Sequence, residues 1–191
     1  MVEVPGLSEK TRKKGKITNM PTPKPVAASI LAPMSFPKLG GGSVSIGGEQ
    51  DNWTLLVVYR GKHCPRCKKY LKILNDMRDQ WYDAGFNIAV VSADPIEKAQ
   101  ADQDEFGWAF DLGYGLLEDQ MNTLGLYVTE PLSPSETDRR FAEPGVFVIR
   151  PDGSMVLICI SNGPSARPEL AELLDGMVFT KEKDRPPRGT V

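Results

Sequence analysis

Two cysteines separated by two residues are the part of this sequence best suited to chemistry. They stand in the segment YRGKHCPRC, Tyr59 to Cys67, directly after an apolar stretch. This spacing places Cys64 and Cys67 on one face at the start of a helix, close enough to form a disulfide. The residues therefore predict thiol-disulfide redox chemistry.

The position of Cys64 at the predicted helix start favours its thiolate. Unpaired backbone N–H groups at a helix N-terminus lower the pKa of a thiol there, and nearby cations add to the effect. We therefore expect Cys64 to be the attacking nucleophile and Cys67 the shielded, resolving thiol. The cations close in sequence are Arg60, Lys62, Arg66, Lys68 and Lys69.

The same residues also allow other interpretations. A cysteine pair is also half of a zinc site, for which His63 and Cys159 are the remaining soft ligands. Redox chemistry is the better prediction, with no metal and no other cofactor. His63 either packs at the surface or tunes Cys64, and both interpretations stay open. Cys159, in the apolar segment VLICI, is predicted to be a buried structural thiol, and Asp94 a solvated or capping carboxylate.

Composition excludes several classes of function. A net charge of -2 offers no basic excess to bind nucleic acid. No apolar run approaches the roughly 18 to 20 residues of a membrane span, so no membrane association is expected. The first residues, MVEVPGLSEKTRKKGK, carry charges where a secretory signal is apolar. We expect a cytoplasmic protein, because three cysteines of this spacing do not form a disulfide framework.

The predicted domain covers residues 31–178. Residues 1–30 are rich in Lys and Pro, with a basic cluster from Lys10 to Lys16, and are predicted to be a flexible arm. A docking role for this arm, toward a second subunit or an acidic partner, is the alternative. Residues 179–191 are predicted to be a solvated C-terminal tail.

Hydrophobic patterning predicts the order strand, helix, strand, helix, strand, strand, helix. The strands are WTLLVVYR at 53–60, FNIAVVSAD at 86–94, GVFVIR at 145–150 and MVLICI at 155–160. The helices cover about 64–83, the stretch from Pro95, and about 168–176. This order describes the thioredoxin core, an α/β fold with a central mixed sheet flanked by helices. Residues 30–46, with three glycines at a turn, predict an N-terminal hairpin, and residues 118–124 a short helix.

The segment VVYRGKHCPRC resembles the F-Y-R-G-x-W-C-P-x-C segment of peroxiredoxin-like proteins in the alkyl hydroperoxide reductase and thiol-specific antioxidant superfamily. AEPGVFVIRPDGSMV is similar to a strand and turn of that family, and the resemblance covers about residues 30–175. It implies a thioredoxin-like fold in which Pro144 is the cis proline beside the cysteines. It also implies a homodimer, for which no interface is readable from the sequence.

The sequence departs from the family at two positions. Typical peroxiredoxins carry Pro-x-x-x-Thr-x-x-Cys, but here Val57 replaces the proline and Gly61 the threonine. The resemblance makes Arg60 the candidate to stabilise negative charge on a leaving oxygen, with Arg139 and Arg140 as alternatives.

The expected function is that of a thiol-dependent oxidoreductase. Its substrates are hydroperoxides or protein disulfides, and a thiol reductant such as thioredoxin or glutathione regenerates the Cys64/Cys67 pair. The alternative is a non-catalytic thioredoxin-fold module that binds a partner or senses redox state, whose thiols would be slow and unactivated.

Overall fold

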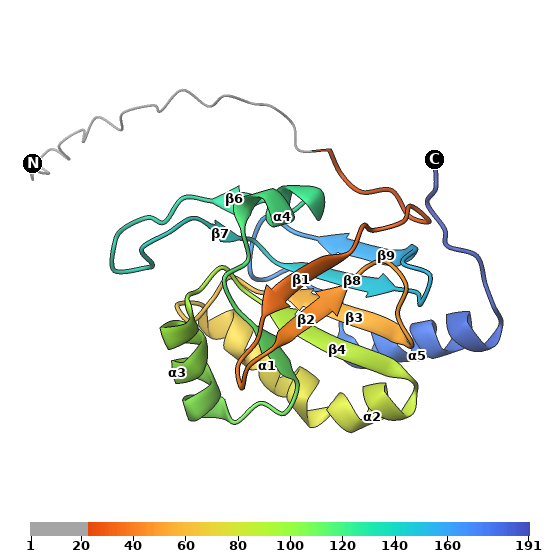
Figure 1. Ribbon diagram of the computed structural model, residues 1–191, viewed down its shortest axis with the longest axis horizontal. Coiled ribbons are helices and arrows are strands. Elements are labelled where there is room, and N and C mark those ends of the chain that lie inside the picture. The colour runs from red at the N-terminus through yellow and green to blue at the C-terminus, as the bar shows by residue number, and fades with distance from the viewer. Residues whose placement is uncertain (1–22) are drawn as a thin grey trace, which may run out of the picture.

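The computed structural model describes residues 23–191, which are built around a five-stranded sheet (Figure 1). The strand order is β5-β4-β3-β8-β9. β3, β4 and β5 are parallel, whereas β8 runs antiparallel to both of its neighbours. The predicted α/β class with a central mixed sheet is therefore confirmed. The strands are β3 (Trp53–Val58), β4 (Phe86–Val91), β5 (Asp111–Gly113), β8 (Gly145–Ile149) and β9 (Met155–Ile160).

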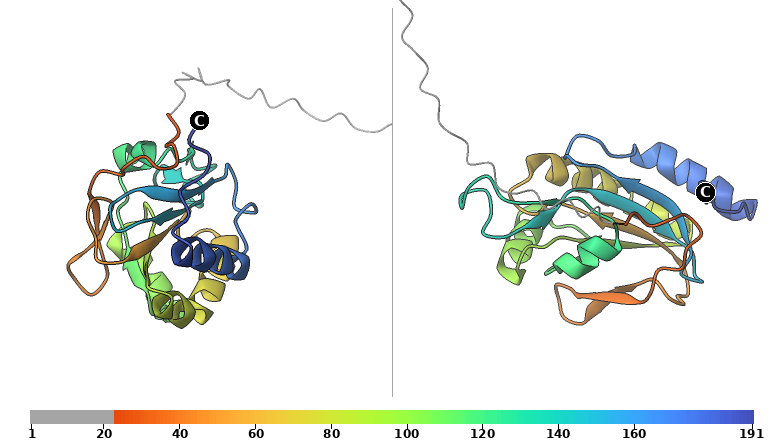
Figure 2. Two further views of the ribbon diagram at one scale, coloured as in Figure 1. Left: turned by 90° about the vertical axis from the view of Figure 1, so that its right-hand side faces the viewer. Right: turned by 90° about the horizontal axis from the view of Figure 1, so that it is seen from above.

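Different elements cover the two faces of this sheet (Figure 2). One face carries α1 (Pro65–Asp76), α2 (Arg78–Asp83) and α5 (Leu170–Glu182), and α3 (Ile96–Phe106) adds Ala99 to the same core. The other carries α4 (Glu118–Thr123) and the strands β1 (Met34–Pro37) and β2 (Ser43–Ile46). Successive residues of β3 point into opposite cores, with Leu55 and Val57 in the first and Leu56 and Val58 in the second. This accounts for the unbroken apolar run of that strand.

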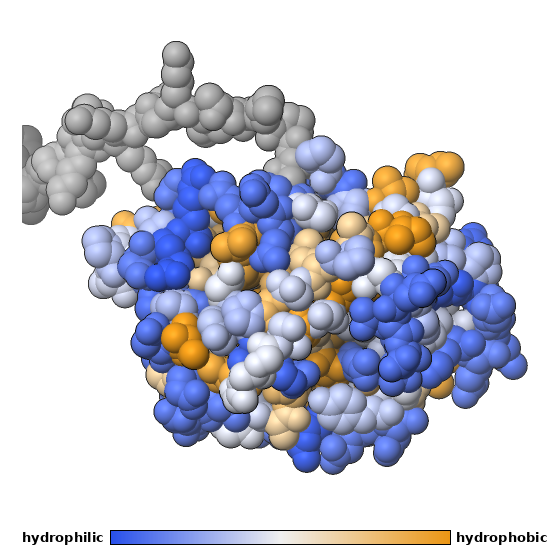
Figure 3. Space-filling model, viewed as in Figure 1, coloured by the Kyte–Doolittle hydropathy of each residue, from blue (hydrophilic) through white to orange (hydrophobic). Residues whose placement is uncertain are grey.

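The N-terminal hairpin is confirmed, with β1 and β2 antiparallel. Its turn uses three glycines at positive φ, from Gly40 to Gly42, a conformation that residues with a Cβ rarely adopt. The hairpin lies on the face drawn in Figure 3, where apolar residues occupy the centre and hydrophilic residues surround them. Among the described residues, no helix is long and apolar enough to cross a membrane.

Two helices differ from their predicted extents. The helix predicted over 64–83 is broken at Met77, where Arg78 Nη1 donates to the carbonyl of Asn75 at 3.1 Å and closes the end of α1. α5 continues to Glu182, past the predicted start of the C-terminal tail. Its last turns are held by Lys181, whose ammonium donates to the carbonyl of Ala84 at 2.7 Å.

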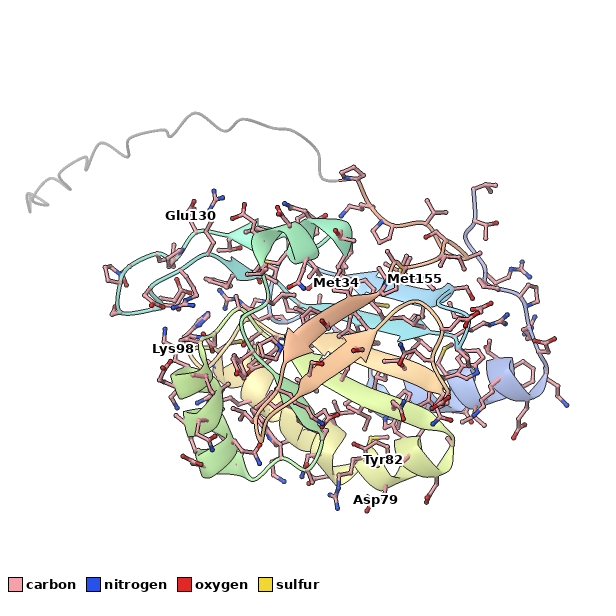
Figure 4. All side chains as sticks on the ribbon, in the orientation of Figure 1. Met34, Asp79, Tyr82, Lys98, Glu130 and Met155 are labelled. Atoms are coloured by element: carbon pink, nitrogen blue, oxygen red, sulfur yellow. The ribbon has the colours of Figure 1, made fainter. Side chains whose placement is uncertain are left out.

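The middle of the chain contains a second small sheet of β6 (Val128–Thr129) and β7 (Phe141–Ala142), which sequence patterning did not predict. The polar loop 130–140 joins the two strands. Lys98, on the end of α3 near this loop (Figure 4), donates to Thr137 Oγ1 at 3.0 Å and to Asp138 Oδ1 at 2.9 Å. The loop is thereby fixed beside the cysteine motif.

Only the last residues of the predicted N-terminal arm are described, and they pair with β9. The N–H of Ala28 donates to Met155 O at 2.8 Å, and the N–H of Met155 donates to Ser29 O at 3.1 Å. The basic cluster from Lys10 to Lys16 lies outside the described residues.

Candidate active site

Cys64 is the N-cap of α1, and Pro65 occupies the first helical position. The Cys64 sulfur accepts the backbone N–H of Cys67 at 3.3 Å, the bond that an N-cap side chain normally accepts. Hydrogen bonding from the Cys67 thiol and N–H and from Arg60 lowers the pKa of Cys64 to about 6, although burial opposes the shift. Cys64 is therefore a thiolate at neutral pH.

Cys67 lies one helical turn from Cys64 and is completely buried. Its hydrogen bond with Cys64 and its burial raise its pKa, so the proton of the pair stays on Cys67. Arg167 acts in the opposite direction, since its Nη2 atom lies 2.9 Å from Cys67 Sγ. Both thiols are free. The pair thus holds a nucleophilic thiolate beside a thiol that has its own cation.

Arg60 lies two residues after the end of β3 and is held by two carboxylates. Its guanidinium lies 3.3 Å from Glu136 of loop 130–140 and 3.2 Å from Glu143, and it covers the ring of Phe141 at 4.7 Å. Glu143 is itself fixed by Thr129, whose hydroxyl donates to it at 2.9 Å. Arg60 is consequently held in one orientation beside Cys64.

The other candidate arginines do not contact the sulfurs. Arg139 pairs with Asp138, and Arg140 pairs with Glu118 and Glu130, all on exposed surface. Of the three arginines considered from the sequence, Arg60 is the one beside Cys64.

His63 packs against Phe141, with ring centroids 4.6 Å apart, and its ring nitrogens make no hydrogen bond to the described residues. Burial and the neighbouring Arg60 lower the pKa of His63, because both disfavour the charged imidazolium. Cys159 lies on the edge strand β9 and is only partly buried, whereas the sequence predicted a buried thiol. In the described part of the chain, no three His, Cys, Asp or Glu side chains gather closely enough to hold a metal ion.

The predicted cis bond before Pro144 is wrong, because no peptide bond among the described residues is cis. A trans bond is favoured by about 0.5–1 kcal/mol at X–Pro, and the neighbouring backbone is hydrogen-bonded around it. The N–H of Glu143 donates to Tyr127 O at 2.8 Å, and the N–H of Ser161 donates to Pro144 O at 3.1 Å. These bonds extend the pairing of β6 with β7 and of β8 with β9.

The structure explains why glycine occupies position 61. Gly61 has φ +119°, and a Cβ there would lie 2.5 Å from Asp94 Oδ2. Asp94 is buried and accepts the N–H of Lys62 at 2.6 Å, while burial raises its pKa. Its predicted role as a solvated or capping carboxylate is therefore wrong, because Asp94 is buried and binds a loop N–H, while Pro95 is the N-cap of α3. The carboxyl group of Asp94 fills the space that a threonine side chain at position 61 would need.

Sequence reasoning missed Glu136, Glu143 and Arg167 as site residues. All three lie at least 69 positions beyond Cys67. Glu143 stands in the family-like segment AEPGVFVIRPDGSMV, but that resemblance gave its carboxylate no role in the site. A charged residue two positions before the strand-like segment GVFVIR was the available signal for Glu143. Arg167 had none, since it stands in the irregular segment SNGPSARPEL.

A sheet of this topology with two cysteines at the N-terminus of its first helix defines a thiol protein of thioredoxin-like fold. The model of the AhpC/TSA family matches residues 29–158, and the chain belongs to that family. The predicted family is thus confirmed.

Solved structures of peroxiredoxins share the fold. The peroxiredoxin-like protein from Aquifex aeolicus matches with a TM-score of 0.69 and 15% identity, over 82% of this chain and 88% of its own. Peroxidoxin BcpB from Mycobacterium tuberculosis matches with a TM-score of 0.64 and 15% identity, over 84% of this chain and 98% of its own. AhpC from Enterococcus faecalis matches with a TM-score of 0.66 and 15% identity, over 83% of this chain and 96% of its own. No curated protein matches the chain.

Membership of this family supports a peroxidase-type enzyme with a thiol-dependent antioxidant role.

Proposed function

We propose that this protein is a thiol peroxidase that cycles Cys64 and Cys67 between dithiol and disulfide. The observation that carries the proposal is the Cys64 sulfur at the N-cap of α1, with a pKa lowered to about 6 and Arg60 beside it. A thiolate in this position is the form that attacks an oxidant. The family match supports a hydroperoxide as that oxidant.

In the first step the Cys64 thiolate attacks the terminal oxygen of a hydroperoxide, ROOH. An S–O bond forms, the O–O bond breaks, and RO⁻ leaves and takes up a proton to become ROH. Arg60 stabilises the negative charge on the leaving oxygen. Cys64 becomes a sulfenic acid.

In the second step Cys67 loses its proton and its sulfur attacks that of Cys64. The disulfide forms, and the sulfenic oxygen leaves as water after taking up the proton from Cys67. A thiol reductant such as thioredoxin or glutathione then supplies two electrons and restores the dithiol.

A second candidate function is reduction of protein disulfides, and Gly61 is the observation that favours it. The threonine that holds a peroxide in typical peroxiredoxins is absent, and Asp94 leaves no room for it. The near-complete burial of Cys64, which is 1% exposed, argues against bulky disulfide substrates and favours a small hydroperoxide.

The test is stopped-flow oxidation of the reduced protein by hydrogen peroxide and, separately, by a small disulfide. We expect rapid consumption of peroxide that is lost in Cys64→Ser, and a stable Cys64 sulfenic acid in Cys67→Ser. Exchange with the disulfide alone would establish the second candidate. Inertness toward both oxidants would instead indicate a binding or redox-sensing module.

A further inference from the structure

A groove of about 300 Å³ lies between α1 and the segment 164–170 that leads into α5, and its lining begins at Arg66, the residue directly before Cys67. Its wall on α1 consists of residues at helical spacing, so they share one side of that helix. The opposite wall includes Arg167, whose guanidinium reaches Cys67. The principal lining residues are Arg66, Lys69, Tyr70, Ile73, Pro164 and Arg167.

The cations that line the groove outnumber its carboxylates, so the lining has a net positive charge. None of Arg66, Lys69 and Arg167 forms an ion pair with a carboxylate of the described residues, whereas Lys62 and Lys68 close by both pair with Asp102. The groove also contains one acid, Glu169, but this carboxylate accepts the N–H of Glu172 at 2.8 Å and caps α5. The lining therefore attracts an anion.

The lining also offers apolar surface next to these cations. Ile73 is 40% exposed, and the ring of Tyr70 lies under the Arg167 guanidinium at 5.2 Å. The hydroxyl of Tyr70 donates to Pro168 O at 3.0 Å, which ties α1 to the far wall. A ligand that matches this lining is small and carries carboxylates on a partly apolar body.

We infer that this groove binds a small carboxylate-bearing thiol that reduces the Cys64–Cys67 disulfide. The inference rests on the proposed dithiol-disulfide cycle and names the class of its electron donor. Its basis is the excess of cations over carboxylates and the exposed apolar surface in a groove whose Arg167 contacts Cys67.

The reduction takes two thiol molecules. The first, as its thiolate RS⁻, attacks Cys64 Sγ; an S–S bond to Cys64 forms, the Cys64–Cys67 bond breaks, and Cys67 leaves as a thiolate. Arg167, 2.9 Å from Cys67 Sγ in the reduced protein, stabilises this leaving group. A second RS⁻ attacks the sulfur of the bound thiol, so RSSR departs and Cys64 is released as a thiolate. The two thiols are oxidised to one RSSR, and their two electrons remain on the protein as the Cys64 and Cys67 thiolates. Cys67, whose pKa is raised, then takes up a proton.

This step is tested by comparing how fast a thiol with free carboxylates and the same thiol with esterified carboxylates reduce the oxidised protein. Glutathione and its diethyl ester are the probes, with each rate normalised to the same thiol's rate with a small free disulfide. We expect glutathione to be favoured, and Lys69→Gln to slow it about threefold without changing the ester rate. Lys72→Gln is the matched control, because Lys72 lies on the same helix and pairs with Asp76 at 3.0 Å outside the groove. The inference would be overturned if glutathione and its ester gave equal normalised rates. It would also be overturned if Lys72→Gln slowed glutathione as much as Lys69→Gln does.

A binding experiment separates this inference from the proposed peroxidase cycle. The double variant Cys64→Ser/Cys67→Ser has no redox chemistry at the motif, and S-methylglutathione cannot donate electrons. We expect saturable NMR shifts of the amides of Ser165, Ala166, Arg167, Glu169 and Leu170. Salt and Lys69→Gln should weaken this binding, whereas Lys72→Gln should not. If the cycle fails but these shifts appear, the groove is an anion site as inferred. If they are absent, the groove assignment is wrong.

Discussion

Each active-site cysteine has its own arginine, and the two arginines are held in different ways. Arg60, beside Cys64, forms ion pairs with Glu136 and Glu143. Arg167, beside Cys67, is held by the carbonyl of Pro164 and contacts no carboxylate of the described residues. Two anions already partly neutralise the charge of Arg60, whereas that of Arg167 is directed at Cys67.

This difference corresponds to the different tasks of the two sulfurs. Cys64 has the helix N-terminus and a hydrogen bond from Cys67 to favour its thiolate, so it depends on Arg60 only in part. Cys67 is buried and has a raised pKa, and Arg167 is the cation in contact with it. We therefore expect Arg167 to matter more to Cys67 than Arg60 does to Cys64.

The largest predicted effect is the loss of stability caused by a substitution at Gly61, three residues before Cys64. Gly61→Ala should destabilise the protein by about 2–3 kcal/mol, because the new Cβ meets a buried carboxyl group at positive φ. Chemical denaturation measures the change. Gly176→Ala is the control, since that site in α5 is open and alanine should stabilise the helix by up to about 1 kcal/mol. Equal effects at both glycines would contradict the packing argument.

Loss of Arg167 tests the Cys67 side. In a Cys64→Ser background, Arg167→Met should raise the pKa of Cys67 by about 2, because a buried thiolate loses its contacting cation. The pH dependence of Cys67 alkylation reports this value. The neighbouring Arg66→Met should have a smaller effect, since Arg167 and not Arg66 is hydrogen-bonded to the sulfur. An unchanged Cys67 profile would show that Arg167 only packs there.

Loss of Arg60 should have a smaller effect than loss of Arg167, because Arg60 is already paired with two carboxylates. Arg60→Met is expected to raise the pKa of Cys64 by about 1, because hydrogen bonds from Cys67 persist. The rate of Cys64 alkylation against pH measures the shift, with Arg139→Met as an exposed and ion-paired control. A larger shift here than in Arg167→Met would reverse the comparison.

The smallest predicted effect comes from removing the charge of one of the two carboxylates that pair with Arg60. Glu143→Gln should lower the pKa of Cys64 by a few tenths, because more of the Arg60 charge then acts on the sulfur. The amide keeps an oxygen for the Thr129 hydroxyl, so the β6–β7 region stays in place. Cys64 alkylation under the same conditions measures it, and a higher pKa would show that Glu143 acts by orienting Arg60.

Local patterns predicted the elements that hold the motif, and long-range contacts determined the rest. The buried strand β3 and the N-cap cysteine are readable because apolar runs, Pro65 and the helical spacing all lie within one segment. The partners of the two arginines come from loop 130–140, the end of β7 and the segment before α5. Their approach depends on tertiary packing, which periodicity does not encode.

Pro144 shows the same limit. Its place before β8 was read correctly, but the isomer of its peptide bond was transferred from a family resemblance and is trans here. Gly61 was recognised as a departure from the family, whereas its cause, the buried carboxyl of Asp94, required the folded structure.

The most direct test of the account is the pH dependence of alkylation of the reduced protein, resolved by site with mass spectrometry. The thiolate is the reactive form, so the Cys64 rate should rise with pH through a midpoint near the pKa of about 6 and then level off. Cys67, with its raised pKa, should stay unmodified over that range. A Cys64 midpoint near the ordinary thiol value of about 8.5, or earlier modification of Cys67, would contradict the assignment of Cys64 as the activated nucleophile.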